Sequence, residues 1–140
     1  KAELIKIELL DQNGNPKNIF RSRELSIINA SIRFNDDIDS DFVVGYKLFS
    51  KFGVIYGTCT LWEDIAFNKH QKGDVVKIRF TQKLCLAPGF YSIDFDIATA
   101  EFPGNNIEIL NTVSSVLLFQ IESPKPYCGV IDLYSKIQLE

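Results

Sequence analysis

The sequence predicts an all-β fold, an antiparallel β-sandwich of about eight strands. Apolar and polar residues alternate with period two along most of the chain, as they do in strands that bury one face. Eleven Phe, five Tyr and one Trp favour pleated surfaces, where aromatic side chains pack well. Clusters of Gly, Pro and Asn separate the alternating runs at short intervals, and no segment shows a convincing helical period.

The first four expected strands lie before residue 62. The first, 3–11, ends at the turn Asn-Gly-Asn-Pro at 13–16, and the second, 24–34, places Ile28 and Ile32 on one face with Ser31 on the other. An acidic loop at 35–41 leads into the third, 42–50. A tight turn at Phe52-Gly53 then connects it to the fourth, 54–61, as in a hairpin.

The second half repeats this pattern after an irregular polar loop at 62–73. Residues 74–82 and 89–98 alternate apolar and polar side chains, and a long loop at 99–112 precedes the next expected strand, 113–121. Two prolines at 124 and 126 then separate a last strand, 129–138. Short strands with these connections predict Greek-key topology, of Ig-like or jelly-roll type.

Length and composition indicate one domain spanning 1–140. The net charge is −3 with cations scattered among acids, which disfavours nucleic acid as a partner. No run approaches the roughly 18 apolar residues of a membrane-spanning helix. Because the chain begins at Lys1 and contains no Met, we interpret it as a piece of a longer protein.

Catalytic and metal-binding patterns are weak. Asp94 and Asp96 stand about 6.6 Å apart on one strand face, within the range of inverting glycosidases but also typical of an exposed sheet face. The carboxylates of 37–41 lack the Gly and Glu of a calcium loop. His70 has no companion ligand or triad partner, so we interpret it as a surface loop residue. We therefore expect no catalytic residues, no metal and no cofactor.

The three cysteines, Cys59, Cys85 and Cys128, form no CxxC pair. Reduced thiols are the favoured interpretation, and a Cys59–Cys85 disulfide is the alternative. Aromatic residues at the hairpin, Phe52, Tyr56 and Trp62, are more suggestive. Such rings stack on the apolar faces of sugars, although Trp62 alternatively closes one end of the core.

Several segments in order resemble the C-terminal domain of the ATP-binding subunit of bacterial O-antigen ABC exporters, the Wzt-type polysaccharide-binding domain. The matching segments are 7–14, 42–48, 53–60, 86–93, 118–121 and 129–131. They cover nearly the whole chain. One position departs from the family pattern, since Cys59 replaces its usual Asn.

The resemblance implies a non-catalytic module that binds the finished end of O-antigen polysaccharide. It further implies a homodimer in which the last strand crosses to the partner, and an ATPase in a separate N-terminal domain. The full-length protein would then engage the transmembrane subunit of the exporter, at the cytoplasmic face of the inner membrane. The alternatives are a glycan-active enzyme and a structural or adhesive Ig-like domain.

An Ig-like strand order predicts where the glycan binds. It places the strands that carry Lys47, Thr58, Asp94 and Gln120 side by side, with their outward residues on one surface. We expect alanine at Asp94, Asp96 or Tyr56 to weaken binding without affecting the fold. The predicted carbohydrate-binding residues are Lys47, Phe49, Tyr56, Thr58, Ser92, Asp94, Asp96 and Gln120, with Trp62 at the rim.

Overall fold

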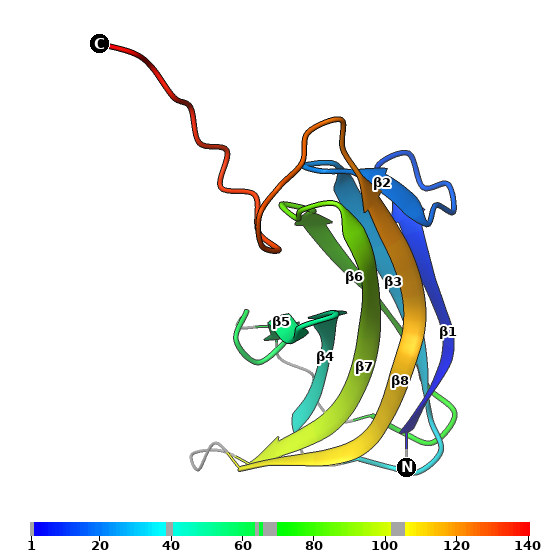
Figure 1. Cartoon of the computed structure of the whole chain (residues 1–140). Helices are drawn as coiled ribbons and strands as arrows, with labels where there is room; N and C mark the ends of the chain where they lie inside the picture. Colours follow the sequence, from blue (N-terminus) through cyan, green and yellow to red (C-terminus); the bar gives the residue numbers. More distant parts are fainter. Residues whose placement is uncertain (1, 39–40, 64, 66–69, 102–105) are drawn as a thin grey trace.

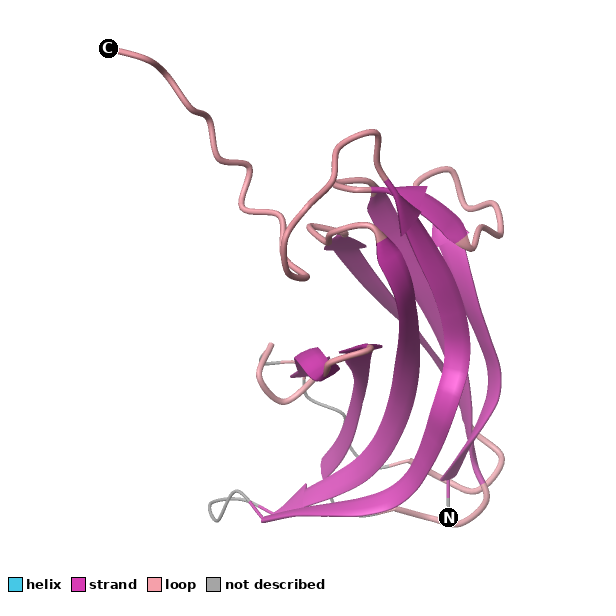
Figure 2. Ribbon diagram, in the orientation of Figure 1, coloured by secondary structure: helices cyan, strands magenta, loops and turns pink. Residues whose placement is uncertain are grey.

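The computed structural model describes residues 2–38, 41–63, 65, 70–101 and 106–140, and these form strands, turns and loops without a helix (Figure 2). Consequently, the described residues include no helix of the length and apolar character needed to cross a bilayer. The strands are β1 (Ala2–Asp11), β2 (Ile19–Arg21), β3 (Leu25–Phe34), β4 (Asp41–Ser50), β5 (Gly53–Cys59), β6 (Val75–Lys83), β7 (Gly89–Glu101) and β8 (Asn106–Glu122) (Figure 1).

Two sheets form the sandwich. One has the strand order β1-β3-β6 and the other the order β2-β8-β7-β4-β5. All neighbouring strands run antiparallel except β2 and β8, which pair in parallel over three residues. The structure therefore confirms the predicted all-β sandwich. It adds β2, which is too short to give an alternating pattern in the sequence.

The core lies between the sheets and is built from the apolar side of each alternating run. In β3, every second residue from Ile28 to Phe34 is buried, whereas the alternate residues Asn29, Ser31 and Arg33 are more exposed. Phe95 of β7 is fully buried and contacts Phe80 of β6 edge to face, with ring centres 6.4 Å apart. Aromatic side chains thus connect the two sheets.

Of two predicted connections, one agrees with the structure and one does not. The turn at Phe52-Gly53 is confirmed, because Ser50 pairs with Gly53 across the β4–β5 hairpin. The long loop predicted at 99–112 is wrong, since β7 continues to Glu101 and β8 begins at Asn106. Cross-strand pairing keeps residues 99–101 and 106–112 extended even though their sequence contains polar residues, and residues 102–105 of the predicted loop lie outside the described residues.

The last expected strand, 129–138, is also wrong for the single chain. Only Ile131 pairs there, in an isolated bridge with Leu86. The following residues leave the sandwich as an extended tail (Figure 1). Leu133, Ile137 and Leu139 are exposed on it, and Ile137 retains 92% of its accessible surface. A strand needs a neighbouring edge, and the tail does not lie against one.

The three thiols are free, which excludes the alternative Cys59–Cys85 disulfide in this structure. His70 is not the surface loop residue predicted from its isolation in the sequence. Its ring stacks on Phe34 with centres 4.4 Å apart, and its backbone pairs with Ile38. The described residues contain no group of three metal-ligating side chains. The acidic loop itself includes residues 39–40, which lie outside the described residues.

Candidate functional site

The larger sheet brings the predicted binding strands together. Its order β8-β7-β4-β5 places Gln120, Asp94, Lys47 and Thr58 on four adjacent strands, as expected. Whether their side chains share a surface depends on cross-strand register, because residues directly opposite each other project to the same face of a sheet. The register divides the predicted residues into two groups.

Six predicted residues lie on the side of this sheet that faces away from the core, which we call the outer face. Lys47 lies opposite Asp94, and Phe49 lies opposite Ser92. Phe90 of β7 pairs with Gln120 of β8. The predicted residues of the outer face are Lys47, Phe49, Ser92, Asp94, Asp96 and Gln120.

One half of the outer face is polar, and its side chains make ion pairs and hydrogen bonds with one another and with the backbone. The Lys47 Nζ lies 3.5 Å from Asp96 Oδ2, and the Thr112 hydroxyl donates a 2.7 Å hydrogen bond to Asp96 Oδ1. Asp94 accepts a 2.7 Å hydrogen bond from the backbone N–H of Ser115. Ser115 has a φ of 49° in a β8 bulge, so the Asp94 carboxylate supports a backbone that a non-glycine residue rarely adopts.

This bonding corrects one expectation about Asp94. Its side chain points away from the core as predicted, but it also satisfies a backbone donor of the bulge. Alanine at Asp94 would leave that N–H without its partner and would disturb β8. A loss of binding in such a variant would therefore not identify Asp94 as a ligand contact.

The other half of the outer face is apolar and includes two residues that the sequence did not single out. Phe90 is 77% exposed and Leu118 is 66% exposed. Leu118 of β8 lies opposite Ser92 of β7, which lies opposite Phe49 of β4. Because Phe49 in turn lies opposite Val54 of β5, these residues form a row across four strands. Phe90 could have been found, because it alternates with inward Tyr91. Leu118 lies in the run 116–119, in which all four residues are apolar. An alternating pattern is absent there, so the sequence does not indicate which side chains face the core.

Tyr56 and Thr58 do not lie on the outer face. Tyr56 pairs with Leu48 and Thr58 pairs with Tyr46, and both partners belong to the buried core. A register shift between Leu48 and Phe49 is the cause, because an extra residue in β5 reverses the face of all that follow. The prediction of a single surface was therefore wrong for these two residues.

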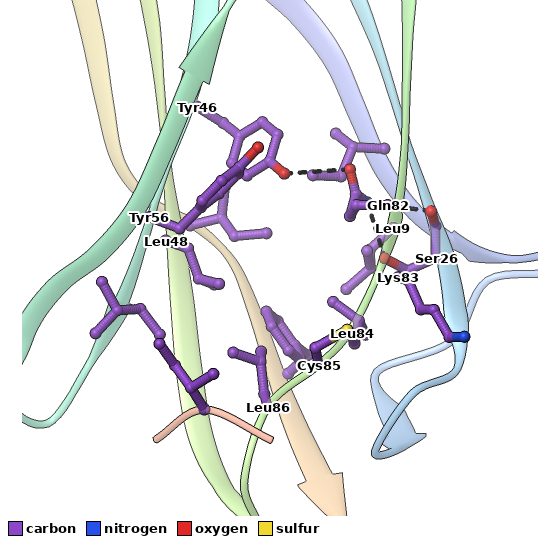
Figure 3. Close-up of a pocket in the computed structure, with 15 residues that line it drawn as sticks. Leu9, Ser26, Tyr46, Leu48, Tyr56, Gln82, Lys83, Leu84, Cys85 and Leu86 are labelled. Carbon is purple, nitrogen blue, oxygen red and sulfur yellow. Dashed lines mark hydrogen bonds between the residues drawn. The ribbon is translucent and has the colours of Figure 1, made fainter. Parts of the chain in front are cut away.

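These two side chains instead line the opening between the sheets at the edges of β5 and β6, which we call the edge cleft. One hollow of the cleft has a volume of about 370 Å³ and a largely apolar lining (Figure 3). Tyr46 and Tyr56 form one side of it, and Gln82 with Leu84 forms the opposite side. A second hollow continues past Thr58 toward Glu63, whose carboxylate accepts a 3.5 Å hydrogen bond from the Thr58 hydroxyl.

Hydrogen bonds cross the edge cleft and join the two sheets. The Tyr46 hydroxyl donates to Gln82 Oε1 at 3.2 Å, and Gln82 Nε2 donates to the Ser26 hydroxyl at 2.8 Å (Figure 3). Burial raises the pKa of Tyr46 well above its ordinary value. The phenol therefore stays neutral and remains a hydrogen-bond donor.

Trp62 does not close the end of the core. It lies in the turn after β5 with most of its indole exposed, and its backbone N–H donates to the Cys59 carbonyl at 3.2 Å. Exposed Phe52, at the β4–β5 turn, lines a further hollow of about 350 Å³ together with Phe90 and Tyr127. The rings of Phe52 and Tyr127 therefore lie beside Phe90, at the apolar half of the outer face.

The fold and these surfaces define a β-sandwich domain with an exposed face of mixed apolar and polar character. The chain belongs to the Wzt C-terminal domain family, whose model matches residues 1–133. A solved structure described as the crystal structure of the C-terminal domain of Wzt is similar in fold, with a TM-score of 0.86 and 21% sequence identity. That match covers 99% of this chain and 84% of the solved one. No curated protein sequence matches the chain.

Proposed function

We propose that this domain is a non-catalytic carbohydrate-binding module that binds bacterial O-antigen polysaccharide, at its finished end, for export by an ABC transporter. Family membership supports the biological context. The observation that carries the proposal is the outer face itself. It places the apolar row formed by Val54, Phe49 and Leu118 beside the ion pair of Lys47 and Asp96.

This arrangement suits a sugar chain. Pyranose rings have apolar faces that contact aromatic and aliphatic side chains, and hydroxyl groups that hydrogen-bond to carboxylate, amide and ammonium groups. A shallow face buries little apolar area, and its polar groups must exchange water for hydroxyls. We therefore expect an affinity of roughly micromolar to millimolar.

An enzyme is the less favoured alternative. The two carboxylates that could act as an acid–base pair are each held by groups of the protein, Asp94 by Ser115 and Asp96 by Lys47 and Thr112. Each carboxylate therefore already serves a contact within the protein, whereas the two carboxyl groups of a glycosidase must be free to flank the scissile bond. We therefore propose binding without catalysis.

The proposed context extends beyond this domain. In the full-length protein, an N-terminal ATPase domain would supply the energy for transport, and the protein would engage the transmembrane subunit of the exporter. In this proposal the domain would lie in the cytoplasm, at the inner membrane. Its task there would be to present the polysaccharide to the transporter.

Alanine substitutions distinguish the outer face from the edge cleft. We expect Phe90→Ala and Lys47→Ala each to weaken glycan binding about tenfold, or ~1.4 kcal/mol, because each removes one contact of the outer face. Titration calorimetry with the O-polysaccharide that binds the parent domain measures this. Val75→Ala, an exposed apolar residue on the opposite sheet, is the matched control. Loss of binding in Tyr56→Ala but not in Phe90→Ala would place the glycan in the edge cleft instead.

We also propose a homodimer in which the C-terminal segment of each chain packs against its partner. The exposed Leu133, Ile137 and Leu139 form an apolar segment that the single chain does not bury. Light scattering at micromolar concentration should give the mass of two chains. A mass of one chain at every concentration measured would contradict the proposed homodimer.

A further inference from the structure

The C-terminal tail leaves the sandwich at a cluster of polar contacts centred on Asp132. This carboxylate is almost completely buried. Its Oδ2 atom accepts hydrogen bonds from Arg23 Nε at 3.0 Å and from the Ser22 hydroxyl at 3.1 Å. Its Oδ1 atom accepts one from the backbone N–H of Tyr134 at 2.9 Å. One side chain therefore joins the β2–β3 connection to the start of the tail.

Backbone hydrogen bonds fix the residues just before this point. The Asp132 N–H donates to the Cys85 carbonyl at 3.0 Å, and the Ala87 N–H donates to the Val130 carbonyl at 2.9 Å. Between them, Ile131 bridges to Leu86 and lines the end of the edge cleft. Residues 130–132 thus form a short strap across one end of the cleft.

Backbone conformation then determines the direction of the tail. Arg23 and Tyr134 both have positive φ values, 78° and 59°, in the left-handed region that non-glycine residues rarely adopt. The Arg23 guanidinium lies 3.7 Å from the centre of the Tyr134 ring, and Cys85 Sγ lies 3.0 Å from the Tyr134 hydroxyl. Strained backbone persists where several contacts enforce it. Beyond Tyr134, the chain extends away from the body (Figure 1).

The charge of Asp132 is also secured. The hydrogen bond from Arg23, helped by Tyr134 N–H and the Ser22 hydroxyl, lowers the pKa of Asp132 from its ordinary value to about 2. Arg23 stays protonated at any physiological pH. The ion pair is therefore intact wherever the protein is folded near neutral pH.

We propose that Arg23 and Asp132 are positioning residues that direct the segment 135–140 away from its own sandwich and toward a second copy of this chain. The inference rests on the proposed homodimer. With the ion pair in place, the strap keeps Ile131 at the cleft and the turn at Tyr134 sends the tail outward. Without it, the turn loses the contacts that enforce its conformation, and the tail samples other directions, including its own cleft.

The variants Arg23→Ala and Asp132→Asn test this role, with Arg21→Ala as the control. Arg21 is an exposed arginine of neighbouring β2 for which the described residues show no ion pair. We expect the dimer dissociation constant of both test variants to rise about tenfold or more. The tail is then no longer ordered before the two chains meet, so association itself carries the free-energy cost of ordering it. Amide exchange at Asp132 and Ala87 should also accelerate about tenfold, while core amides such as that of Val44 stay protected.

Carboxyl titration by NMR adds a readout that a general loss of packing would not produce. In the parent domain, the pKa of Asp132 should be about 2, and in Arg23→Ala it should return toward the ordinary 3.8. A parent dimer whose test variants dissociate at the same concentration as Arg21→Ala would overturn the positioning role alone. A parent domain that is monomeric would overturn the proposed homodimer, and with it the positioning role of Arg23 and Asp132. Glycan binding by the outer face is measured separately and is not affected by either result.

Discussion

Replacement of Gly45 by alanine is expected to lower the free energy of unfolding by about 3 kcal/mol, although the change adds one methyl group to a strand. The new Cβ would lie 2.8 Å from the Cβ of Cys59 and would overlap the Thr58 carbonyl oxygen. Both contacts belong to β5, directly across the pair. Relief requires β4 and β5 to separate, which would disturb the outer face and the edge cleft together.

Gly57 provides the matched control in the same hairpin. A Cβ there would meet Lys47 Cγ and the Tyr46 carbonyl oxygen at 3.6 Å, an ordinary contact distance. Gly57→Ala should therefore change stability little, or raise it slightly by restricting the unfolded chain. Urea unfolding followed by circular dichroism compares the two variants. Equal stability of Gly45→Ala and Gly57→Ala would contradict the close approach of β5 to Gly45.

Truncation after Glu122 is expected to give insoluble protein. It removes Asp132, which would leave Arg23 without its buried partner, and it removes the strap that covers Leu86. It also removes Val130, which packs against the core. Newly exposed apolar surface at the open end of a sandwich promotes aggregation. The fraction of the expressed chain that stays in solution after centrifugation measures the effect.

Truncation after Tyr134 separates the strap from the tail. This variant keeps Asp132 and Ile131 but loses Ile137 and Leu139, both almost fully exposed in the single chain. We expect it to be soluble and monomeric by light scattering. A soluble dimer of this variant would show that residues 135–140 do not hold the copies together. A soluble product from the truncation after Glu122 would show that the strap is dispensable.

Alternation was enough to predict the sandwich and seven of its strands, because the core selects one face of each run. It failed where structure depends on contacts rather than pattern. The three residues of β2 are too few to show a period, and they are held by parallel pairing with β8. The hairpin of β7 and β8 extends through residues whose composition favours a loop, because each strand supplies the other with hydrogen-bond partners.

The candidate site was predicted in part for a related reason. Outward residues of β4 and β7, such as Lys47 and Ser92, are assigned correctly, since their pairing is regular there. One bulge residue in β5 turns the side chains of Tyr56 and Thr58 to the other face of the sheet. The position of a bulge cannot be recognised from a single sequence. Similarly, the partnership of Arg23 with Asp132 joins positions far apart in the sequence, and alternation carries no information about such pairs.

Binding of the domain to a panel of purified O-polysaccharides tests the central proposal most directly. Titration calorimetry should reveal one polysaccharide that binds saturably, with a dissociation constant between roughly micromolar and millimolar, as a shallow mixed face predicts. That polysaccharide should come through the titration chemically unchanged. The proposal would be contradicted if no member of the panel bound at millimolar repeat-unit concentration, or if the bound polysaccharide were cleaved.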